Sequence, residues 1–468
     1  MIKLTLGEIA AIVEGQVINA DAGFTTSAYP VINSKLANSE TFFAAFAGSN
    51  TDGHDYISSA ISNGAQFALV SKDCSAPAIK VSDVSVALTK LAIFVREKLQ
   101  AVTVIGITGS QGKTTTKDLL LHILSVSGET IAPAESLNNE LGVPLLLLRC
   151  TETTKYCIVE MGARHIGDIK YLSEIAKPQI GVVLGVGKAH VGEFGSREII
   201  AKTKSELISA LGPQGIAILG TYDEFTPNMN PKAGVRKLFF GEKSQCDIRA
   251  ADIEVREGRA HFDLVTPDGR AAVSLQLLGL HQISNALAAA AVATALHIPI
   301  ETISAALSTA EVSSKWRMAI SEIGEVTIIN DSYNANPEST AAALRTLALI
   351  SQETGGVSWA FLGKMHELGE SSNDEHAAIG RLVTEIGVDH LVVIGAREYL
   401  TDLTLDSAGG ESAVHYFESK VEALSMVEHF APGDVVLLKA SRAEEFNLLA
   451  ELIEDKLQNS PGRDEVEQ

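Results

Sequence analysis

The amino-acid sequence predicts an α/β protein with three domains, and three observations lead to this prediction. Its 468 residues would fill a few domains of about 100–200 residues each. Two series of strand and helix patterns begin near residues 101 and 313, whereas residues 221–278 alternate polar and apolar positions. We expect domains at 1–98, 99–312 and 313–468: a small α/β domain, a parallel-sheet domain with an antiparallel portion, and a doubly wound, Rossmann-like domain.

Composition narrows the class of protein. The formal net charge of −21, from 37 Lys and Arg against 58 Asp and Glu, disfavours a nucleic-acid partner. The four cysteines lack metal-ligand spacing and are typical of reduced thiols in a cytosolic protein. Neither a signal peptide nor a membrane span is expected, because the chain lacks a cleavage pattern and a run of about 18 apolar residues. We expect a cytoplasmic location.

The strands and helices of the first two domains follow from local patterns. In the first domain, "GAQFALVS" predicts a strand and "VALTKLAIFVREKLQ" a helix that leads into the second. There, "AVTVIGITG" predicts a buried strand followed by the helix "GKTTTKDLLLHILSVSG". "YCIVEMGA" and "IGVVLGVG" have the continuous apolar character of further parallel strands.

The remaining elements complete the prediction. Residues 221–278 are expected to form antiparallel strands, with a turn at "TPDG". The next segment, "HQISNALAAAAVATALHIP", predicts a helix stopped by Pro299. In the third domain, "VTIINDSY", "VSWAFLG", "HLVVIG" and "DVVLLKAS" predict strands with helices between them.

The segment "ITGSQGKTTTKDLL" resembles a phosphate-binding loop that opens a helix. Gly109 and Gly112 would let backbone N–H groups approach phosphate oxygens, Lys113 would supply a positive charge, and the Thr114 hydroxyl would bind Mg²⁺. The usual pattern has a glycine where this chain has Ile107. A glycine turn with a surface lysine is the alternative, but the preceding strand and following helix favour a nucleotide site.

Polar residues follow three predicted strands of the central domain. Lys113, Glu160 and His190 each lie at or just beyond a strand end, where ligands of open α/β sheets bind. Thr114 and Glu160 suit Mg²⁺, which prefers oxygen ligands, and His190 could complete the shell of a second metal. By itself, His190 is equally typical of a loop histidine with ordinary hydrogen bonds.

A lysine interrupts an apolar helical stripe in "SREIIAKTKSELISALG". Ser196 is a good N-cap, and Lys204 falls among apolar residues at helical spacing, whereas Lys202 lies on the polar side. A buried ammonium without a partner is unfavourable. The sequence therefore favours a site lysine, with a lysine that reaches the solvent along its stem as the alternative.

The variant loop pattern T-G-x-x-G-K-[ST] resembles the ATP loop of the Mur ligase family, and the resemblance extends over nearly the whole chain. "FFAAFAGSNTDGHDYISSAISNGAQFALV" resembles a UDP-sugar domain, and "SLNNELGVPLLLL" and "FLGKMHELGE" resemble segments of the dipeptide-adding members. "GLHQISNALAAAAVATAL", "KWRM" and "NDSYNANPES" resemble the family's ATP contacts. The resemblance implies an N-terminal UDP-sugar domain, a central P-loop ATPase domain and a C-terminal ligase domain.

The resemblance also implies roles for individual residues. It makes Lys113, Lys204, His190 and Arg317 catalytic, with Lys204 carbamylated by CO₂ and bridging metal ions held by Thr114, Glu160 and His190. The implied ATP contacts are Thr108, Gly109, Ser110, Gln111, Gly112, Lys113, Thr114, Thr115, His281, Asn285, Arg317, Asp331, Asn334 and Asn336. The implied substrate contacts are Ser34, Lys35, Asp52, Gly53, His54, Asn138 and Asn139.

The activity implied by the resemblance is an ATP-dependent ligation. ATP would phosphorylate the terminal carboxylate of UDP-N-acetylmuramoyl-tripeptide, and the amine of D-alanyl-D-alanine would attack the acyl phosphate. The implied cofactors are ATP and two Mg²⁺ ions, and a monomer is expected. Two alternatives are a folylpolyglutamate-synthase-like ligase, which "DGHDYI" disfavours, and a nucleotide-switch or UDP-sugar-binding protein without ligase chemistry.

Five positions depart from the family pattern. Asn33-Ser34-Lys35 stands where an Asp-Ser-Arg sequence is usual, which makes uridine contacts there uncertain because lysine lacks the bidentate fork. Arg164, Lys364 and Ala440 replace residues usual in the family. None of these departures falls in the phosphate loop or among the proposed metal ligands, so they bear on the details of substrate binding and not on the expected activity.

Overall fold

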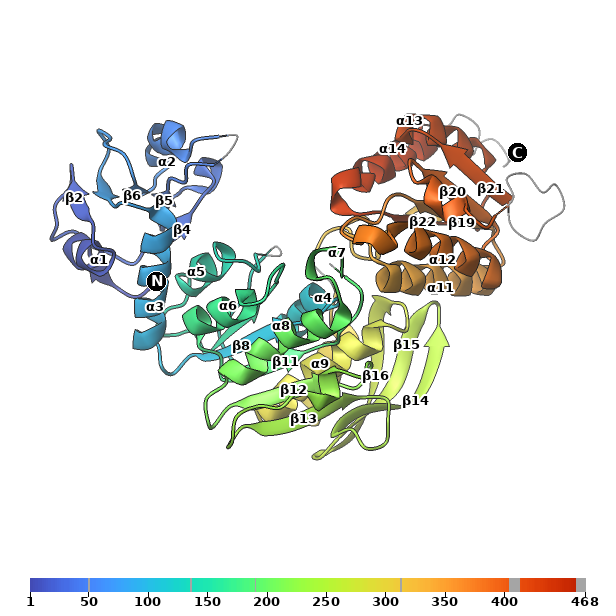
Figure 1. Cartoon of the computed structure of the whole chain (residues 1–468), viewed down its shortest axis with the longest axis horizontal. Coiled ribbons are helices and arrows are strands. Elements are labelled where there is room, and N and C mark those ends of the chain that lie inside the picture. Colours follow the sequence, from blue (N-terminus) through green and yellow to red (C-terminus); the bar gives the residue numbers. More distant parts are fainter. Residues whose placement is uncertain (49–50, 135–136, 190, 312–313, 404–412, 460–468) are drawn as a thin grey trace, which may run out of the picture.

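The computed structural model describes all residues except 49–50, 135–136, 190, 312–313, 404–412 and 460–468. Three sheets follow one another along the chain, and the first and third lie at opposite ends of the second (Figure 1). A short ribbon of β1 (Leu4–Thr5) and β3 (Thr25–Thr26) accompanies the first sheet. The predicted α/β class is confirmed.

The N-terminal sheet has the strand order β2-β7-β6-β5-β4, parallel except for β2. Its strands are β2 (Gln16–Ile18), β4 (Tyr29–Val31), β5 (Thr41–Ala44), β6 (Ala68–Val70) and β7 (Ala78–Lys80). The helices are α1 (Leu6–Ile12), α2 (Ile57–Ser62) and α3 (Val84–Lys98). Asp83 caps α3, whose buried apolar face shares one core with both the N-terminal and central sheets. This shared core attaches the N-terminal sheet firmly to the central one.

The central sheet has the order β16-β15-β14-β13-β12-β11-β8-β10-β9. Its parallel part comprises β8 (Thr103–Thr108), β9 (Thr130–Ile131), β10 (Tyr156–Glu160), β11 (Ile180–Val183), β12 (Ile216–Gly220) and β13 (Arg236–Gly241). The strands β14 (Ile248–Arg256), β15 (Arg259–Thr266) and β16 (Gly269–Leu278) are antiparallel to one another. The prediction of antiparallel strands across 221–278 was wrong for β13, which pairs in parallel with β12 and β14. Local alternation does not reveal strand direction, which depends on the connection between strands.

Helices cover both faces of the parallel part. The helices of the central part are α4 (Lys113–Ser125), α5 (Gly142–Leu147), α6 (Asp168–Ala176), α7 (Val191–Phe194), α8 (Arg197–Ala210), α9 (Gln282–Ala295) and α10 (Ile300–Thr309). Of these, α10 packs on the antiparallel β16, and α7 contacts α8 and the C-terminal part. The alanine-rich α9 is buried along its length and packs on α4. Pro299 was expected to stop α9, but α9 ends at Ala295 and Pro299 is the N-cap of α10. A proline fits that position because it lacks an N–H to leave unpaired.

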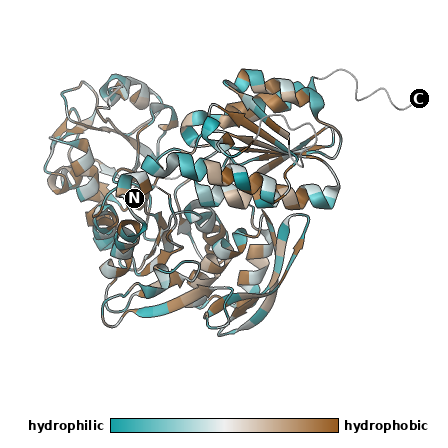
Figure 2. Ribbon diagram, turned by 45° about the vertical axis from the view of Figure 1, so that its right-hand side comes forward, coloured by the Kyte–Doolittle hydropathy of each residue, from teal (hydrophilic) through white to brown (hydrophobic). Residues whose placement is uncertain are grey.

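The C-terminal sheet has the order β17-β18-β22-β19-β20-β21, parallel except for β17. Its strands are β17 (Ala319–Ile323), β18 (Val326–Asn330), β19 (Ser358–Leu362), β20 (His390–Ile394), β21 (Ala413–Phe417) and β22 (Val435–Lys439). The helices α11 (Pro337–Thr354) and α12 (Ser372–Glu385) cover one face, and α13 (Lys420–Ala423) and α14 (Phe446–Gln458) cover the other. The strands are hydrophobic between the more polar outer faces of the helices (Figure 2). This is the predicted doubly wound arrangement.

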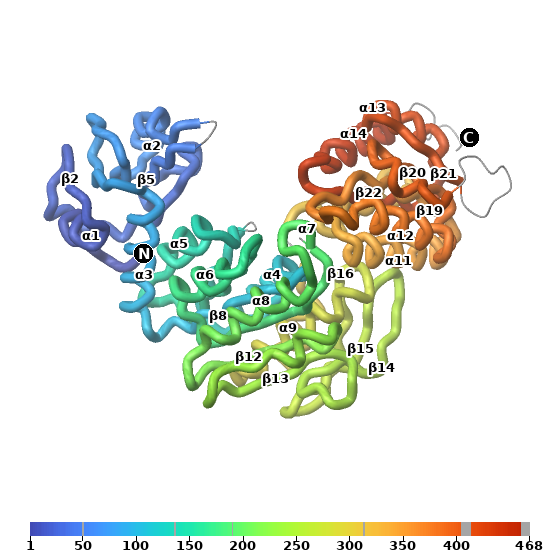
Figure 3. The backbone as a smooth tube through the Cα atoms, viewed as in Figure 1, coloured from blue at the N-terminus to red at the C-terminus, as the bar shows by residue number. Residues whose placement is uncertain are grey.

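The C-terminal part packs against the central part on two sides. The short helix α7 lies beside the loop that precedes α12, as the tube in Figure 3 also shows. Helix α11 faces the antiparallel hairpins, where Glu353 accepts a hydrogen bond from the N–H of Gly258 (2.8 Å). None of the helices in the described ranges is both long and apolar enough to cross a bilayer.

Candidate active site

A cavity of about 690 Å³ lies between the central and C-terminal sheets. The phosphate loop and the start of α9 line it from the central side, and segments after β18, β19 and β22 line it from the other. A larger hollow of about 840 Å³ lies between α6 and α8, at the amino ends of β11 and β12, and contains none of the predicted site residues. Ligands of parallel α/β sheets bind at the carboxyl ends of strands, so the smaller cavity is the candidate active site.

The phosphate loop has the geometry that its glycines permit. Gly112 is the N-cap of α4 with φ of 79°, and a Cβ there would lie 2.2 Å from Oδ1 of Asn285. The Lys113 ammonium donates to the carbonyl oxygen of Gly109 (3.0 Å), so it folds back over the loop. Burial, together with the nearby Arg317 charge, lowers the pKa of Lys113, although Glu160 opposes this effect. The loop therefore presents a partly desolvated cation at the start of a helix.

Oxygen ligands suitable for Mg²⁺ meet beside Lys113. The Thr114 hydroxyl donates to Oε2 of Glu160 (3.0 Å), and the Asn138 amide donates to Oε1 of the same carboxylate (2.9 Å). Glu160 is 1% exposed, and a buried carboxylate next to a hydroxyl is the kind of oxygen donor set that Mg²⁺ prefers. The Arg317 guanidinium reaches the Thr114 hydroxyl from the C-terminal side (3.0 Å) and stacks on Tyr333. These residues fit a magnesium nucleotide.

Lys204 is held inside the protein by helix α8. Ser196 caps the helix, and the predicted apolar stripe of Ile200, Leu207, Ile208 and Leu211 is buried. Lys204 is 7% exposed and, among the residues that the structure describes, its ammonium forms no hydrogen bond or ion pair. Burial and the charge of Lys113 lower the pKa of Lys204 to about 7. His190 lies outside the described residues.

The residues expected around the nucleoside all line the cavity: His281, Asn285, Asp331, Asn334 and Asn336. The Asn285 Oδ1 accepts a hydrogen bond from the Thr116 hydroxyl (3.3 Å), and the Asn285 amide donates to Gln282 (2.8 Å). Asn285 therefore links α9 to α4.

Asn285, Asn336 and His281 differ in whether their side chains are already held by hydrogen bonds within the protein. Asn336 caps α11 in a capping box with Ser339. Burial lowers the pKa of His281 to about 4, so the ring is neutral at pH 7. Asn285 and Asn336 thus have structural hydrogen bonds, and His281 presents a neutral ring at the wall of the cavity.

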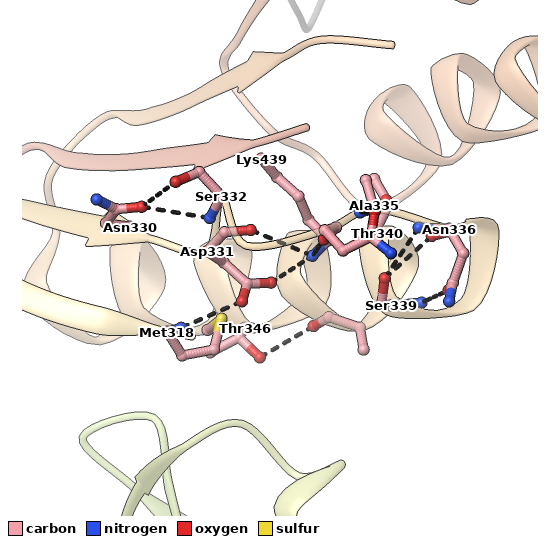
Figure 4. A network of polar contacts seen from close by, with 12 residues as sticks. Met318, Asn330, Asp331, Ser332, Ala335, Asn336, Ser339, Thr340, Thr346 and Lys439 are labelled. Carbon is pink, nitrogen blue, oxygen red and sulfur yellow. Dashed lines mark hydrogen bonds and ion pairs between the residues drawn. The ribbon is translucent and has the colours of Figure 1, made fainter. Parts of the chain in front are cut away.

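Lys439, for which no role was predicted, organises the C-terminal side of the cavity (Figure 4). Its ammonium, which is 2% exposed, pairs with the Asp331 carboxylate (2.5 Å) and donates to the carbonyl oxygen of Asn334 (3.0 Å). The other oxygen of Asp331 accepts from the N–H of Met318 (3.2 Å), next to Arg317. A charged residue directly after the apolar run "VVLL" is the sequence signal that could have identified it.

Replacing Lys439 with methionine should destabilise the C-terminal part by about 3 kcal/mol, because it leaves the Asp331 carboxylate without its buried partner. Both tryptophans, Trp316 and Trp359, lie in or beside this part, so tryptophan fluorescence during denaturant unfolding measures the change. The matched control is Lys364→Met, at the end of the neighbouring strand, where the lysine is 41% exposed and 3.8 Å from Glu398. Equal stability losses in both variants would contradict the argument.

The predicted substrate residues of the N-terminal part do not line the described cavity. Ser34 is buried in a short 3₁₀ turn capped by Asn33, and Lys35 is exposed beside it. The His54 ring contacts the Asp52 carboxylate (2.6 Å) and accepts from the N–H of Ser71 (3.0 Å). Gly53 allows a close approach to the backbone of Phe46. These residues lie in two segments of the N-terminal part, one before β5 and one after it.

The two predicted asparagines of the loop before α5 have different environments. Asn138 reaches the site through Glu160, as described above, whereas Asn139 accepts the N–H of Gly142 at the start of α5 (2.9 Å). Of the departures from the family pattern, Arg164 lines the cavity with its side chain 68% exposed and 3.9 Å from Glu367. Ala440 is fully buried behind Gly363.

Two family models match the chain. The Mur ligase middle domain matches residues 107–293, and the Mur ligase glutamate ligase domain matches residues 316–442. Together the matches contain the phosphate loop, Glu160, Lys204 and the cavity-lining residues of the C-terminal part up to Arg442.

Similar proteins cover almost the entire chain. The UDP-N-acetylmuramoyl-tripeptide–D-alanyl-D-alanine ligase of Mycobacterium tuberculosis is 38% identical over 97% of this chain and 98% of its own. The enzyme of that name from Escherichia coli is 34% identical over 85% and 87%. The structure of MurF from Acinetobacter baumannii has a TM-score of 0.85 at 32% identity, covering 97% and 99% of the two chains. MurF from Thermotoga maritima in complex with ADP has a TM-score of 0.76 at 29% identity, covering 92% and 98%.

Proposed function

The chain belongs to the Mur ligase family, and we propose that it joins D-alanyl-D-alanine to the terminal carboxylate of UDP-N-acetylmuramoyl-tripeptide with ATP, a step of peptidoglycan precursor synthesis. The observation that carries this proposal is the cluster of Lys113, Thr114, Glu160 and Arg317 in one cavity. It combines cations for a triphosphate with oxygen ligands for a metal, as ATP-dependent activation of a carboxylate requires.

The first step transfers a phosphoryl group to the tripeptide carboxylate. The carboxylate and the triphosphate repel each other, so the site must neutralise negative charge while they approach. Lys113 and Arg317 supply that charge from the two sides of the cavity, and the desolvated position of Lys113 strengthens its effect. Arg317 belongs to the C-terminal part, so the site is complete only when this part is docked, and docking also keeps water from the acyl phosphate.

Magnesium ions, when bound, would stabilise the charge on the phosphate oxygens. Thr114 and Glu160 would hold one ion, and we propose that His190 and carbamylated Lys204 hold a second. Lys204 as an ammonium cannot bind a cation. With a pKa of about 7, a large share of the side chain is a free amine at neutral pH. The amine nitrogen can then bond to the carbon of CO₂ and lose a proton, which leaves a carbamate with two oxygen donors.

In the second step the amine of D-alanyl-D-alanine attacks the acyl phosphate, forms the amide and releases phosphate. One chain supplies both Lys113 and Arg317, so we propose a monomer that acts in the cytoplasm, where nucleotide-linked precursors and ATP are present. We propose that Asp331, tied to Lys439, contacts the ribose of ATP and that His281 contacts the base, because both residues line the cavity.

The decisive experiment measures phosphate release and product mass with purified protein, Mg²⁺ and ATP. We expect release that depends on both UDP-N-acetylmuramoyl-tripeptide and D-alanyl-D-alanine, with formation of the UDP-linked pentapeptide. Phosphate release without the dipeptide would indicate a nucleotide switch or hydrolase instead. Dependence on a folate and glutamate would indicate a folylpolyglutamate-synthase-like ligase.

A further inference from the structure

Three consecutive backbone N–H groups in the loop after β11 donate to side chains from three different parts of the molecule. The bonds are Val186 to Asp223 (3.0 Å), Gly187 to Ser110 (2.8 Å) and Lys188 to Glu338 (2.7 Å). Asp223 follows β12, Ser110 belongs to the phosphate loop, and Glu338 opens α11 of the C-terminal part. Residues 185–188 are thus fixed at the meeting point of the phosphate loop and the docked C-terminal part.

Two hydrogen bonds join residues 185–188 to Ser110 of the phosphate loop. Besides the bond to its hydroxyl, Ser110 donates its own N–H to the carbonyl oxygen of Gly185 (3.0 Å). A shift of residues 185–188 would therefore move Ser110, which lies three residues before Lys113. Any contact that determines the position of this loop also affects how the phosphate loop is held.

Two interactions also join Lys188 to the C-terminal part. Besides the bond from its N–H to Glu338, Lys188 places its ammonium 2.6 Å from the Glu375 carboxylate of α12. Glu338 and Glu375 come from the two helices on the same face of the C-terminal sheet, so both bonds form only when that sheet is docked.

Gly187 allows Glu338 to come this close. A Cβ at this position would lie 2.9 Å from Oε1 of Glu338 and 3.4 Å from the Cβ of Ser110. Any larger residue would displace the Glu338 carboxylate, which is the movable end of a flexible side chain, and leave the backbone in place. The loop is therefore shaped to receive this carboxylate.

We propose that Glu338 is a positioning residue, which transmits docking of the C-terminal part to the phosphate loop through residues 187 and 188. Glu338 does not line the described cavity, and its Oε1 is occupied by a backbone N–H, so it acts through the loop rather than on the substrate. The inference rests on the proposed ligase function and adds a residue to it. With Glu338 in place, Arg317 and the phosphate loop approach the nucleotide together.

The test compares Glu338→Ala with Glu353→Ala. Glu353 lies at the other end of α11 and also accepts a central N–H, that of Gly258, at 2.8 Å, but far along the helix from the phosphate loop. We expect Glu338→Ala to lower kcat about tenfold, the effect of losing one hydrogen bond to a charged group, with the KM for the UDP substrate changed less than about twofold. Glu353→Ala should retain kcat within about twofold. Binding of a non-hydrolysable ATP analogue counts the active sites in each preparation.

Two further variants distinguish positioning from a general loss of structure. Glu338→Gln retains an oxygen acceptor and should recover most of kcat, whereas Gly187→Ala should reproduce the defect of Glu338→Ala from the other side of the contact. Equal losses in Glu338→Ala and Glu353→Ala, full activity of both Glu338→Ala and Gly187→Ala, or no recovery in Glu338→Gln would each overturn the proposal. An unchanged protein that forms no product would instead refute the ligase function itself.

Discussion

Lys113→Met is expected to lower the ligase rate by roughly 10³-fold, because it removes the positive charge beside the transferred phosphoryl group. The ammonium lies over the phosphate loop beside Glu160 and Arg317, in a desolvated position where one positive charge acts strongly on developing negative charge. Methionine has a similar length without the charge, so the fold should persist. Phosphate release in the presence of both substrates, with thermal unfolding as the check on folding, measures the effect.

The matched control for this variant is Lys202→Met. Lys202 lies on the exposed side of α8, so the ligase rate of the Lys202→Met variant should stay within about twofold of that of the unchanged protein. A Lys113→Met protein that is folded and retains more than about a tenth of the activity would show that this charge is not needed for phosphoryl transfer.

Lys204→Ala should lower activity by on the order of 10²–10³-fold, and short-chain carboxylic acids such as formate or acetate should restore part of it. An acid of this size can occupy the space that alanine leaves and supply the oxygen donors that we ascribe to the carbamate. Loss of positive charge alone would not be rescued in this way. Rates measured across a series of acid concentrations test the prediction, and Lys202→Ala is the control.

Carbamylation of Lys204 has a spectroscopic test that does not depend on activity. Unchanged protein equilibrated with ¹³C-labelled bicarbonate should give a carbamate resonance that Lys204→Ala lacks and Lys202→Ala retains. The signal should weaken below pH 7, because protonation removes the free amine when the pH falls below the pKa of about 7. Identical spectra from the unchanged protein and Lys204→Ala, together with no rescue by acids, would rule out the carbamate.

Local sequence patterns were sufficient to predict most of the fold and, within the site, the phosphate loop and Lys204 of the central part. The run from β8 into α4, with its glycines, specifies the phosphate loop because turn, helix start and buried strand are all properties of adjacent residues. Lys204 could be identified because an ammonium in an apolar stripe conflicts with helical periodicity. The direction of β13 could not, because strand alternation is the same in parallel and antiparallel pairs.

The sequence by itself determined that this protein has a phosphate loop, a buried lysine in the apolar stripe of a later helix and a C-terminal doubly wound sheet. The loop, the lysine and each strand or helix of that sheet are each specified by about twenty neighbouring residues or fewer. Only the tertiary structure decided which distant groups complete the site. Arg317 meets Thr114 across 203 positions, Glu338 meets Lys188 across 150, and Lys439 meets Asp331 across 108. These contacts depend on how the folded sheets dock and where their strands lie in each sheet, and no local periodicity carries that information.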